Sequence, residues 1–213
     1  MIATTERTSL LSYPARPVNG GKLEYAPAKV GLWAWQPKID DWRAVIHTPT
    51  RRVWNRHGEP STVAQQGKLE VALDHLSGLS FAAEWLDVGI MENRHDMMRG
   101  SVVVFDVMEG GSYSTRRTKL ESMFQTLPLA SQLLGDSGQY RDGVFLIEHY
   151  VNADPLALYR ALQAENAKLT AKFRRPLKFY EGLVAKKMDA SYPLQMRSPK
   201  FETHTMQKHR FDI

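Results

Sequence analysis

One short segment of the sequence combines a lysine, two acids and an arginine: Gln36-Pro37-Lys38-Ile39-Asp40-Asp41-Trp42-Arg43. Successive side chains of a strand point to opposite faces, so an extended segment places Lys38 and Asp40 on one face and Arg43 on the other, whereas a bend at Pro37 or Asp41 would break this alternation. A lysine amine held beside such charges can act as a nucleophile. A surface strand with solvated charges would have the same composition. This segment alone leaves both interpretations open.

Composition and charge narrow the class of protein. The chain has 213 residues, 43% of them hydrophobic, and can bury a sizeable core as one large domain or two small ones. The absence of cysteine excludes disulfides and thiolate metal sites and argues against zinc. No apolar run approaches the roughly 20 residues of a membrane helix, and residues 1–16 lack the apolar centre of a signal peptide. We therefore expect a cytoplasmic protein that contacts no membrane.

The net charge of +5 and the pI near 9.4 favour a polyanionic partner, because Lys and Arg neutralise the phosphates of nucleic acids. The seven histidines include no i, i+4 pair and no clustered acid, so none is assigned to a metal.

The periodicity of the chain predicts an α+β fold with an antiparallel-leaning sheet and helices packed on it. Residues 1–30 are rich in Pro and Gly and are predicted to form an arm with at most one short element. A hairpin is expected at 43–47 and 51–55. Helices are expected at 62–76, 114–126 and 154–173. Further strands are expected at 81–86, 88–91, 101–107 and 143–151, and a strand pair at 178–187.

Six segments resemble, in order, the motifs of covalent nucleotidyltransferases, specifically the ATP-dependent polynucleotide ligases. The opening segment is similar to the Lys-x-Asp-Gly-x-Arg motif, with Asp41 where the family has glycine. The other five are Asn55-Arg56-His57-Gly58-Glu59, Phe81-Ala82-Ala83-Glu84, Val103-Val104-Phe105-Asp106, Glu181-Gly182-Leu183-Val184-Ala185-Lys186 and Gln207-Lys208-His209-Arg210.

This resemblance covers roughly residues 33 to 210. It implies an ATP-grasp-like nucleotidyltransferase core of largely antiparallel sheets flanked by helices. Residues 31–213 would form this adenylation domain behind the arm at 1–30. The family usually continues into an oligonucleotide-binding (OB) barrel, and we expect no C-terminal OB barrel in this chain.

The resemblance implies a role for each charged motif residue. Lys38 would be the nucleophile that carries AMP, with Asp40, Lys186 and Lys208 as further catalytic residues. A lysine amine attacks phosphorus only when neutral, so burial or neighbouring cations such as Lys186, Lys208 and Arg210 must lower its pKa. The same cations would offset charge on the triphosphate.

The remaining nucleotide contacts are also implied by the resemblance. Gln36 would read the adenine amino group, and Phe105 would stack on adenine, although an aromatic in such a strand is often plain core. Arg43 and Arg56 would hold the ribose or a 5′-phosphate. Glu84 is expected on the ribose hydroxyls. Glu181 would bind Mg²⁺, the alternative being a strand-end charge. ATP and Mg²⁺ are thus the expected cofactors.

The function implied is that of an ATP-dependent DNA ligase, minimal or an isolated adenylation domain, that seals nicks through a covalent lysyl-AMP. The expected partner is nicked duplex DNA, with RNA-containing strands possible, and the expected state is a monomer. The tract from Glu181 through Tyr192 to Arg197-Ser198 is more similar to DNA ligases than to RNA ligases. The alternatives are an RNA ligase, a capping-type guanylyltransferase, or a non-catalytic nucleic-acid-binding module with the ligase fold.

Overall fold

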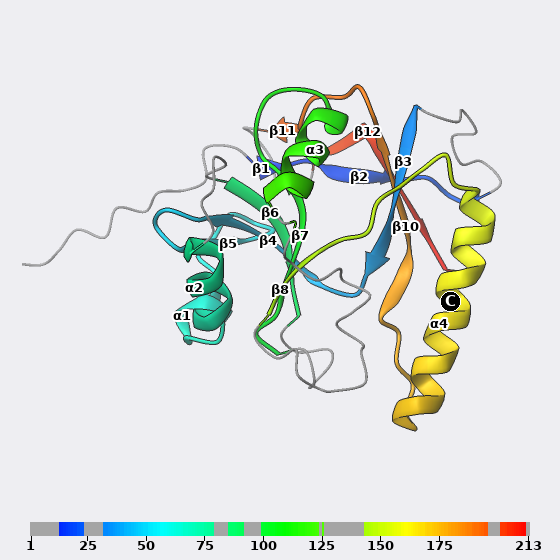
Figure 1. Cartoon of the computed structure of the whole chain (residues 1–213), viewed down its shortest axis with the longest axis horizontal. Helices are drawn as coiled ribbons and strands as arrows, with labels where there is room; N and C mark the ends of the chain where they lie inside the picture. The colour runs from blue at the N-terminus through cyan, green and yellow to red at the C-terminus, as the bar shows by residue number, and fades with distance from the viewer. Residues whose placement is uncertain are drawn as a thin grey trace, which may run out of the picture.

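A computed structural model describes residues 13–23, 32–78, 85–91, 99–123, 125, 143–195 and 201–211. Its strands form two five-stranded sheets and one two-stranded ribbon (Figure 1). The first sheet has the order β2 (Arg16–Asn19), β12 (Glu202–Arg210), β10 (Tyr180–Lys187), β3 (Trp33–Ile39) and β9 (Tyr150–Val151). The second has the order β5 (Arg52–Asn55), β4 (Trp42–His47), β6 (Trp85–Ile90), β7 (Val102–Val107) and β8 (Val144–Leu146). The ribbon pairs β1 (Tyr13–Pro14) with β11 (Leu194–Gln195).

Pairing within the two large sheets is antiparallel except for β2 with β12 and β7 with β8. Two mainly antiparallel sheets flanked by helices confirm the predicted fold class. The chain passes from the first sheet to the second at Asp40 and Asp41, between the end of β3 and the start of β4. The segment that contains Lys38 and Arg43 is therefore two strands with a bend, which breaks the alternation of an extended segment.

Within the described ranges, four helices pack on these sheets: α1 (Thr62–Gln65), α2 (Glu70–Gly78), α3 (Tyr113–Met123) and α4 (Pro155–Phe173). The predicted helix at 62–76 is divided in two, because Gly67 adopts φ +70° between α1 and α2. α4 begins as predicted, with the Asp154 side chain accepting a hydrogen bond from the amide of Leu156 at 2.9 Å. None of the described helices is long and apolar enough to cross a bilayer.

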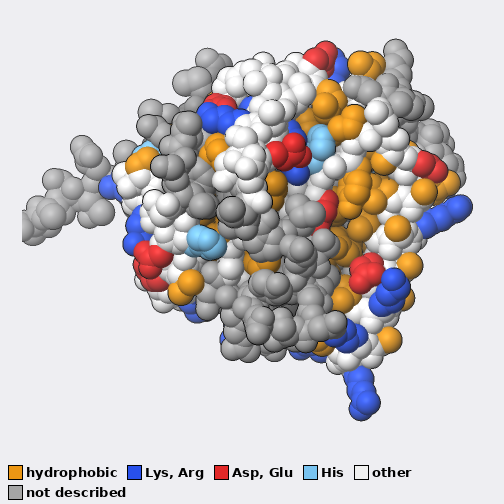
Figure 2. Space-filling view, in the orientation of Figure 1, with side chains coloured by type: hydrophobic (Ala, Val, Ile, Leu, Met, Phe, Trp, Pro, Cys, Tyr) orange, Lys and Arg blue, Asp and Glu red, His pale blue; other side chains and the backbone are white. Residues whose placement is uncertain are grey.

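Two apolar clusters hold the layers together. One lies between the second sheet and helices α1 to α3, and includes Ile46, Leu73 and Leu120. The other joins both sheets to α4, because Leu162 of the helix and Leu183 of β10 share it with Val103 of β7. Figure 1 shows α4 along one side of the first sheet, and Figure 2 shows apolar side chains gathered there with Lys and Arg side chains pointing outward. The sheets are thus fixed relative to each other.

Several predicted boundaries need correction. The N-terminal arm contains two short strands, β1 and β2, where at most one element was expected, and β2 belongs to the first sheet. The segment 178–187 forms one strand, β10, instead of a pair. Residues 85–90 form a single strand across the expected break at 87, while 81–84 lie outside the described residues. The hairpin β4–β5 is confirmed. The division of the chain at residue 30 stays a prediction.

Candidate active site

A pocket of about 620 Å³ is lined by strands of both large sheets. Its lining includes every predicted site residue that the structure describes: Gln36, Lys38, Asp40, Arg43, Arg56, Phe105, Glu181, Lys186, Lys208 and Arg210. Glu84, the predicted ribose contact, lies outside the described residues. Folding thus brings together positions that are separated by most of the chain, although their individual roles stay predictions.

Lys38 lies in β3 and makes direct contact with a carboxylate, Glu181 of β10. Arg210 adds a second cation at 3.8 Å from the same Glu181 oxygen. Burial raises the pKa of Glu181, but the hydrogen bond and charge of Lys38 outweigh burial and hold that pKa below its ordinary value. Glu181 is therefore an anion in the unliganded pocket. The cations expected around Lys38 share its pocket, but the side chain in contact with it is an acid.

Gly182 allows the motif strands to approach one another. It adopts φ +144°, and a Cβ atom at this position would lie 1.9 Å from the carbonyl oxygen of His209 in β12. Only glycine fits this geometry without moving the backbone. The close approach of β10 and β12 brings Lys208 and Arg210 to the pocket beside Glu181.

Gln36 and Phe105 lie at the end of the pocket that is predicted to hold adenine. The Gln36 side-chain amide donates to the Phe105 carbonyl oxygen at 3.2 Å and to the Tyr113 hydroxyl at 3.0 Å. With both amide hydrogens used by the protein, the Gln36 oxygen is the group that can accept from an adenine amino group. Tyr113 is anchored in turn by His149 at 3.0 Å, whose pKa burial lowers to about 4.

Arg43 is held by a buried carboxylate that the sequence did not single out. Its Nε and Nη2 donate to the two oxygens of Asp87 at 2.9 and 2.7 Å, and its Nη1 donates to the Ala15 carbonyl oxygen at 2.9 Å. The Tyr192 hydroxyl donates to the same Asp87 at 2.9 Å. Burial alone would raise the pKa of Asp87, but the adjacent guanidinium lowers it. The Arg43 guanidinium was predicted to bind ribose or a 5′-phosphate, and its Nε and Nη2 bind the Asp87 carboxylate.

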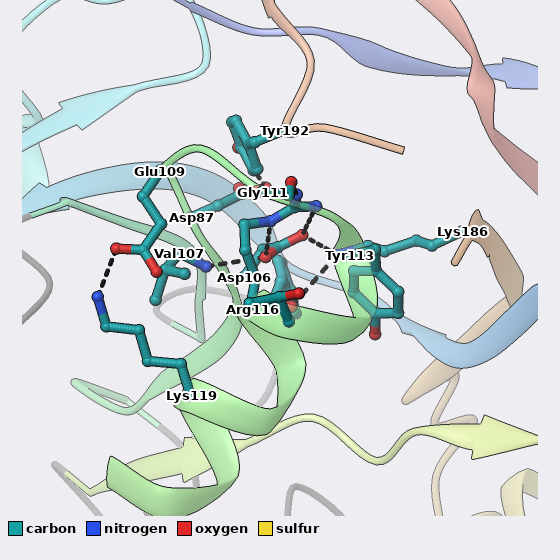
Figure 3. Close-up of polar contacts among 12 residues, drawn as sticks. Asp87, Asp106, Val107, Glu109, Gly111, Tyr113, Arg116, Lys119, Lys186 and Tyr192 are labelled. Carbon is teal, nitrogen blue, oxygen red and sulfur yellow. Dashed lines mark hydrogen bonds and ion pairs between the residues drawn. The ribbon is translucent and has the colours of Figure 1, made fainter. Parts of the chain in front are cut away.

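Lys186, which lines the pocket, belongs to a buried network that includes Asp106 and Arg116 (Figure 3). Its ammonium donates to Asp106 at 3.1 Å and to the Phe105 carbonyl oxygen at 3.2 Å. Asp106 also accepts from Arg116 at 2.9 and 3.2 Å, and from the amide of Val107 at 2.9 Å. Burial lowers the pKa of Lys186, opposed by the charge of Asp106. Arg43 and Tyr192 hold Asp87, while Arg116 and Lys186 hold Asp106, so each of these two buried acids is neutralised by a cation of the protein.

The remaining predicted cations lie toward the opening of the pocket. The Arg210 side chain is 59% exposed. Arg56 is also exposed and donates to His57 at 3.1 Å. Lys208 is more enclosed and pairs with Glu202 at 3.5 Å. Cations at this position can meet phosphates that extend toward solvent.

Sequence reasoning did not single out Asp87, which lines the pocket, or Asp106, which pairs with Lys186 of the lining. Asp87 and Asp106 occur singly inside strongly apolar strands, a pattern that predicts a paired buried charge and could have identified them. Asp41 was recognised only as a departure from the motif glycine. The structure places it in the pocket lining, where burial raises its pKa to about 7.

The carboxylates fit a magnesium ion that arrives with a nucleotide. No group of three or more metal-ligating side chains occurs among the described residues. Glu181 and Asp40 line the pocket together, and the two side chains interact. Mg²⁺ commonly binds one or two carboxylates plus substrate phosphates and waters. This donor set suits that mode and not a closed structural metal site.

Comparisons with known proteins agree at the level of the fold. No protein-family model and no curated protein matches the sequence. Among solved structures, the ligase domain of LigD from M. tuberculosis is 16% identical with a TM-score of 0.56, over 93% of this chain and 59% of that one. A mycobacterial DNA ligase D complexed with ATP and MES is 16% identical with a TM-score of 0.54, over 93% and 60%. A Lig E DNA ligase is 10% identical with a TM-score of 0.51, over 93% and 68%.

This chain therefore spans less than two thirds of the LigD structures that it resembles. Identities this low show a shared fold. The conclusion from the two sheets, the pocket between them and these similarities is that the chain has the fold of the nucleotidyltransferase domain of ATP-dependent DNA ligases.

Proposed function

We propose that this chain is the adenylation domain of an ATP-dependent DNA ligase and that Lys38 is its nucleophile. The observation that supports this most is the pocket itself, in which Lys38 is surrounded by the predicted partners from both sheets. The solved structures compared above are DNA ligases, and one of them is a complex with ATP. ATP is therefore the nucleotide we propose.

The first step would be attack of the neutral Lys38 amine on the α-phosphorus of ATP. A nitrogen–phosphorus bond forms, the bond from that phosphorus to the bridging oxygen breaks, and pyrophosphate leaves. The Lys38 ammonium must first lose its proton to solvent, and Glu181, in contact with it, would orient the side chain. The contact with Glu181 supports a fixed orientation of Lys38 before the reaction.

The cations of the pocket would stabilise negative charge in this step. Lys186 is rigidly held by Asp106, so its ammonium needs little reorganisation when the nucleotide binds. Lys208 and Arg210 lie toward the opening, where the leaving pyrophosphate would exit. Mg²⁺ held by Glu181 and Asp40 would supply further charge neutralisation on the phosphates.

The later steps would use the lysyl-AMP on a polynucleotide. The 5′-phosphate at a nick attacks the AMP phosphorus and releases Lys38, and the 3′-hydroxyl then attacks the 5′-phosphorus and releases AMP. The exposed cations, including Arg56 and Arg210, would contact the DNA backbone. Nicked duplex DNA, a monomeric state, and a cytoplasmic location are part of the proposal.

The proposal is tested by intact-mass measurement after incubation with ATP and Mg²⁺. We expect an AMP adduct on the wild type and on Lys168→Ala, a matched control on the exposed side of α4, and none on Lys38→Ala. An adduct that persists in Lys38→Ala would remove the nucleophile assignment. The absence of an adduct with ATP or GTP would contradict the enzyme proposal.

Substrate choice is tested with the adenylated protein and three nicked duplexes, all-DNA, all-RNA and mixed. Sealing of the RNA duplex alone would favour the RNA ligase, and an adduct with GTP alone would favour the capping-type enzyme. Binding to duplex DNA should weaken with salt, with a slope of about 0.9 per phosphate contact on a double-logarithmic plot. Salt-dependent binding without any adduct would favour the non-catalytic module.

A further inference from the structure

Asp41 and Gly89 form a matched pair inside the pocket. A Cβ atom at Gly89 of β6 would lie 2.6 Å from the Asp41 carboxylate oxygen and 2.6 Å from the ring edge of Phe105. Gly89 is not among the positive-φ glycines, so its backbone does not require glycine. The missing side chain at Gly89 instead provides the space in which the Asp41 carboxylate adjoins the Phe105 ring.

The Asp41 carboxylate is partly buried in the pocket lining, and the nearby cations are committed to other acids. The nearest cations by charge interaction are Lys38 and Arg43, but Lys38 contacts Glu181 and Arg43 is bound bidentately to Asp87. Removing a carboxylate from water, even in part, is costly unless hydrogen-bond donors are supplied. A ligand that brings hydroxyl donors into the pocket would supply them.

The position of Asp41 indicates which part of a nucleotide would supply these hydroxyls. In the proposed reaction the base lies at Phe105 and the α-phosphate at Lys38. Asp41 adjoins Phe105 across Gly89 and interacts electrostatically with Lys38, so it lies near both ends. The group that joins a base to its α-phosphate is the sugar, and a carboxylate can accept hydrogen bonds from two neighbouring hydroxyls.

We propose that Asp41 binds the ribose hydroxyls of the nucleotide and thereby selects ribonucleoside over deoxyribonucleoside triphosphates. This inference rests on the proposed adenylation of Lys38, and it deepens that function by naming a specificity residue. The resemblance implied that Glu84 contacts the ribose hydroxyls, whereas this inference assigns that contact to Asp41, which departs from the family motif. The paired glycine at position 89 makes the substitution at 41 sterically possible.

The test measures kcat/KM of Lys38 adenylation with ATP, 2′-deoxy-ATP and 3′-deoxy-ATP. The wild type should prefer ATP over at least one deoxy analogue by about 10- to 100-fold, the range expected for a hydrogen bond to a charged group. Asp41→Asn and Asp41→Gly should reduce this preference to about threefold or less, mainly by losing activity with ATP. Asp74→Asn, an exposed acid of α2, should keep the wild-type ratio.

The ratio between nucleotides separates recognition from folding, because a merely structural loss lowers all three activities together. If Asp41→Asn and Asp41→Gly both keep the wild-type preference, the inference is overturned while the adenylation proposal stands. Loss of preference in Glu84→Gln alone would likewise overturn it and place the sugar contact at Glu84. If the wild type forms no adduct with any of the three nucleotides, the proposed function fails first.

Discussion

Removing the carboxylate of Asp106 should destabilise the protein strongly, because two buried cations depend on it. Asp106 is 1% exposed and accepts from Arg116 and Lys186, which are themselves buried (Figure 3). Asp106→Ala leaves both cations without their carboxylate in a site that excludes water. Arg116 keeps its bonds to the Gly111 and Ala190 carbonyl oxygens, which cannot neutralise its charge.

The magnitude follows from the burial of the network. Breaking a buried ion pair by removing one partner costs about 3–5 kcal/mol. For a chain of this length, each 1 kcal/mol corresponds to about 2–4 °C in Tm, so we expect Asp106→Ala to lower Tm by about 6–20 °C. The matched control is Glu109→Ala, three positions further along, because Glu109 pairs with Lys119 at 2.5 Å near the surface. An exposed pair of that kind contributes about 0–1 kcal/mol.

Urea unfolding followed by tryptophan fluorescence gives both free energies of unfolding under one condition. We expect the loss for Asp106→Ala to exceed the loss for Glu109→Ala by about 2 kcal/mol or more. Equal losses in the two variants would refute the reasoning, since they would mean that burial does not distinguish the two carboxylates. A stable Asp106→Ala with unchanged adenylation would also contradict the role of Asp106 in holding Lys186.

Two further predictions concern backbone geometry and pH. Gly182→Ala should lower the free energy of unfolding by about 3 kcal/mol or more, because the new Cβ would meet a backbone carbonyl at a positive φ. The control Gly78→Ala should change it by less than about 1 kcal/mol, because a Cβ at Gly78 would have nothing within 4 Å. Similar losses in the two variants would contradict this prediction. The pKa of Asp41 is raised from 3.8 to about 7 on folding, so its contribution to stability is complete below the unfolded pKa and is lost as pH rises through about 7. The stability of the wild type relative to Asp41→Asn should therefore fall between about pH 4 and about pH 7, and urea unfolding that gives a constant difference over this window would refute the assignment.

The sequence predicted the parts of the site that depend on local pattern. Lys38 follows a proline in a short run of apolar and charged residues, and Glu181 and Lys186 occupy one strand at fixed spacing. These residue types and spacings can be recognised directly in the sequence. α4 was also predictable, because Asp154 and Pro155 mark its start independently of what the helix packs on.

The supporting network could not be predicted, because its members are distant in the chain. Asp106 and Lys186 are 80 positions apart, and Tyr192 and Asp87 are 105 apart. An acid inside an apolar strand indicates that a partner exists, but the sequence does not say which residue that partner is. Only the pairing of β10 with β3, and of β6 with β4 and β7, decides which acid meets which cation. The alternation of Lys38 and Arg43 was expected only for an extended segment, and the bend at Asp40 and Asp41, between the two sheets, interrupts it.

Asp41 is a departure from the motif in the sequence, but in the structure its side chain fits the space left by Gly89. In the sequence, an acid in place of a motif glycine only adds bulk and charge. In the structure, β4 pairs with β6 so that Arg43 faces Gly89, and the glycine opens the space that the Asp41 carboxylate fills. Gly89 of β6 has no side chain, and Asp41, directly before β4, supplies one at that point. The volume and the charge of that part of the pocket thus depend on both positions, so the chemical meaning of Asp41 follows from the pair and not from either residue alone.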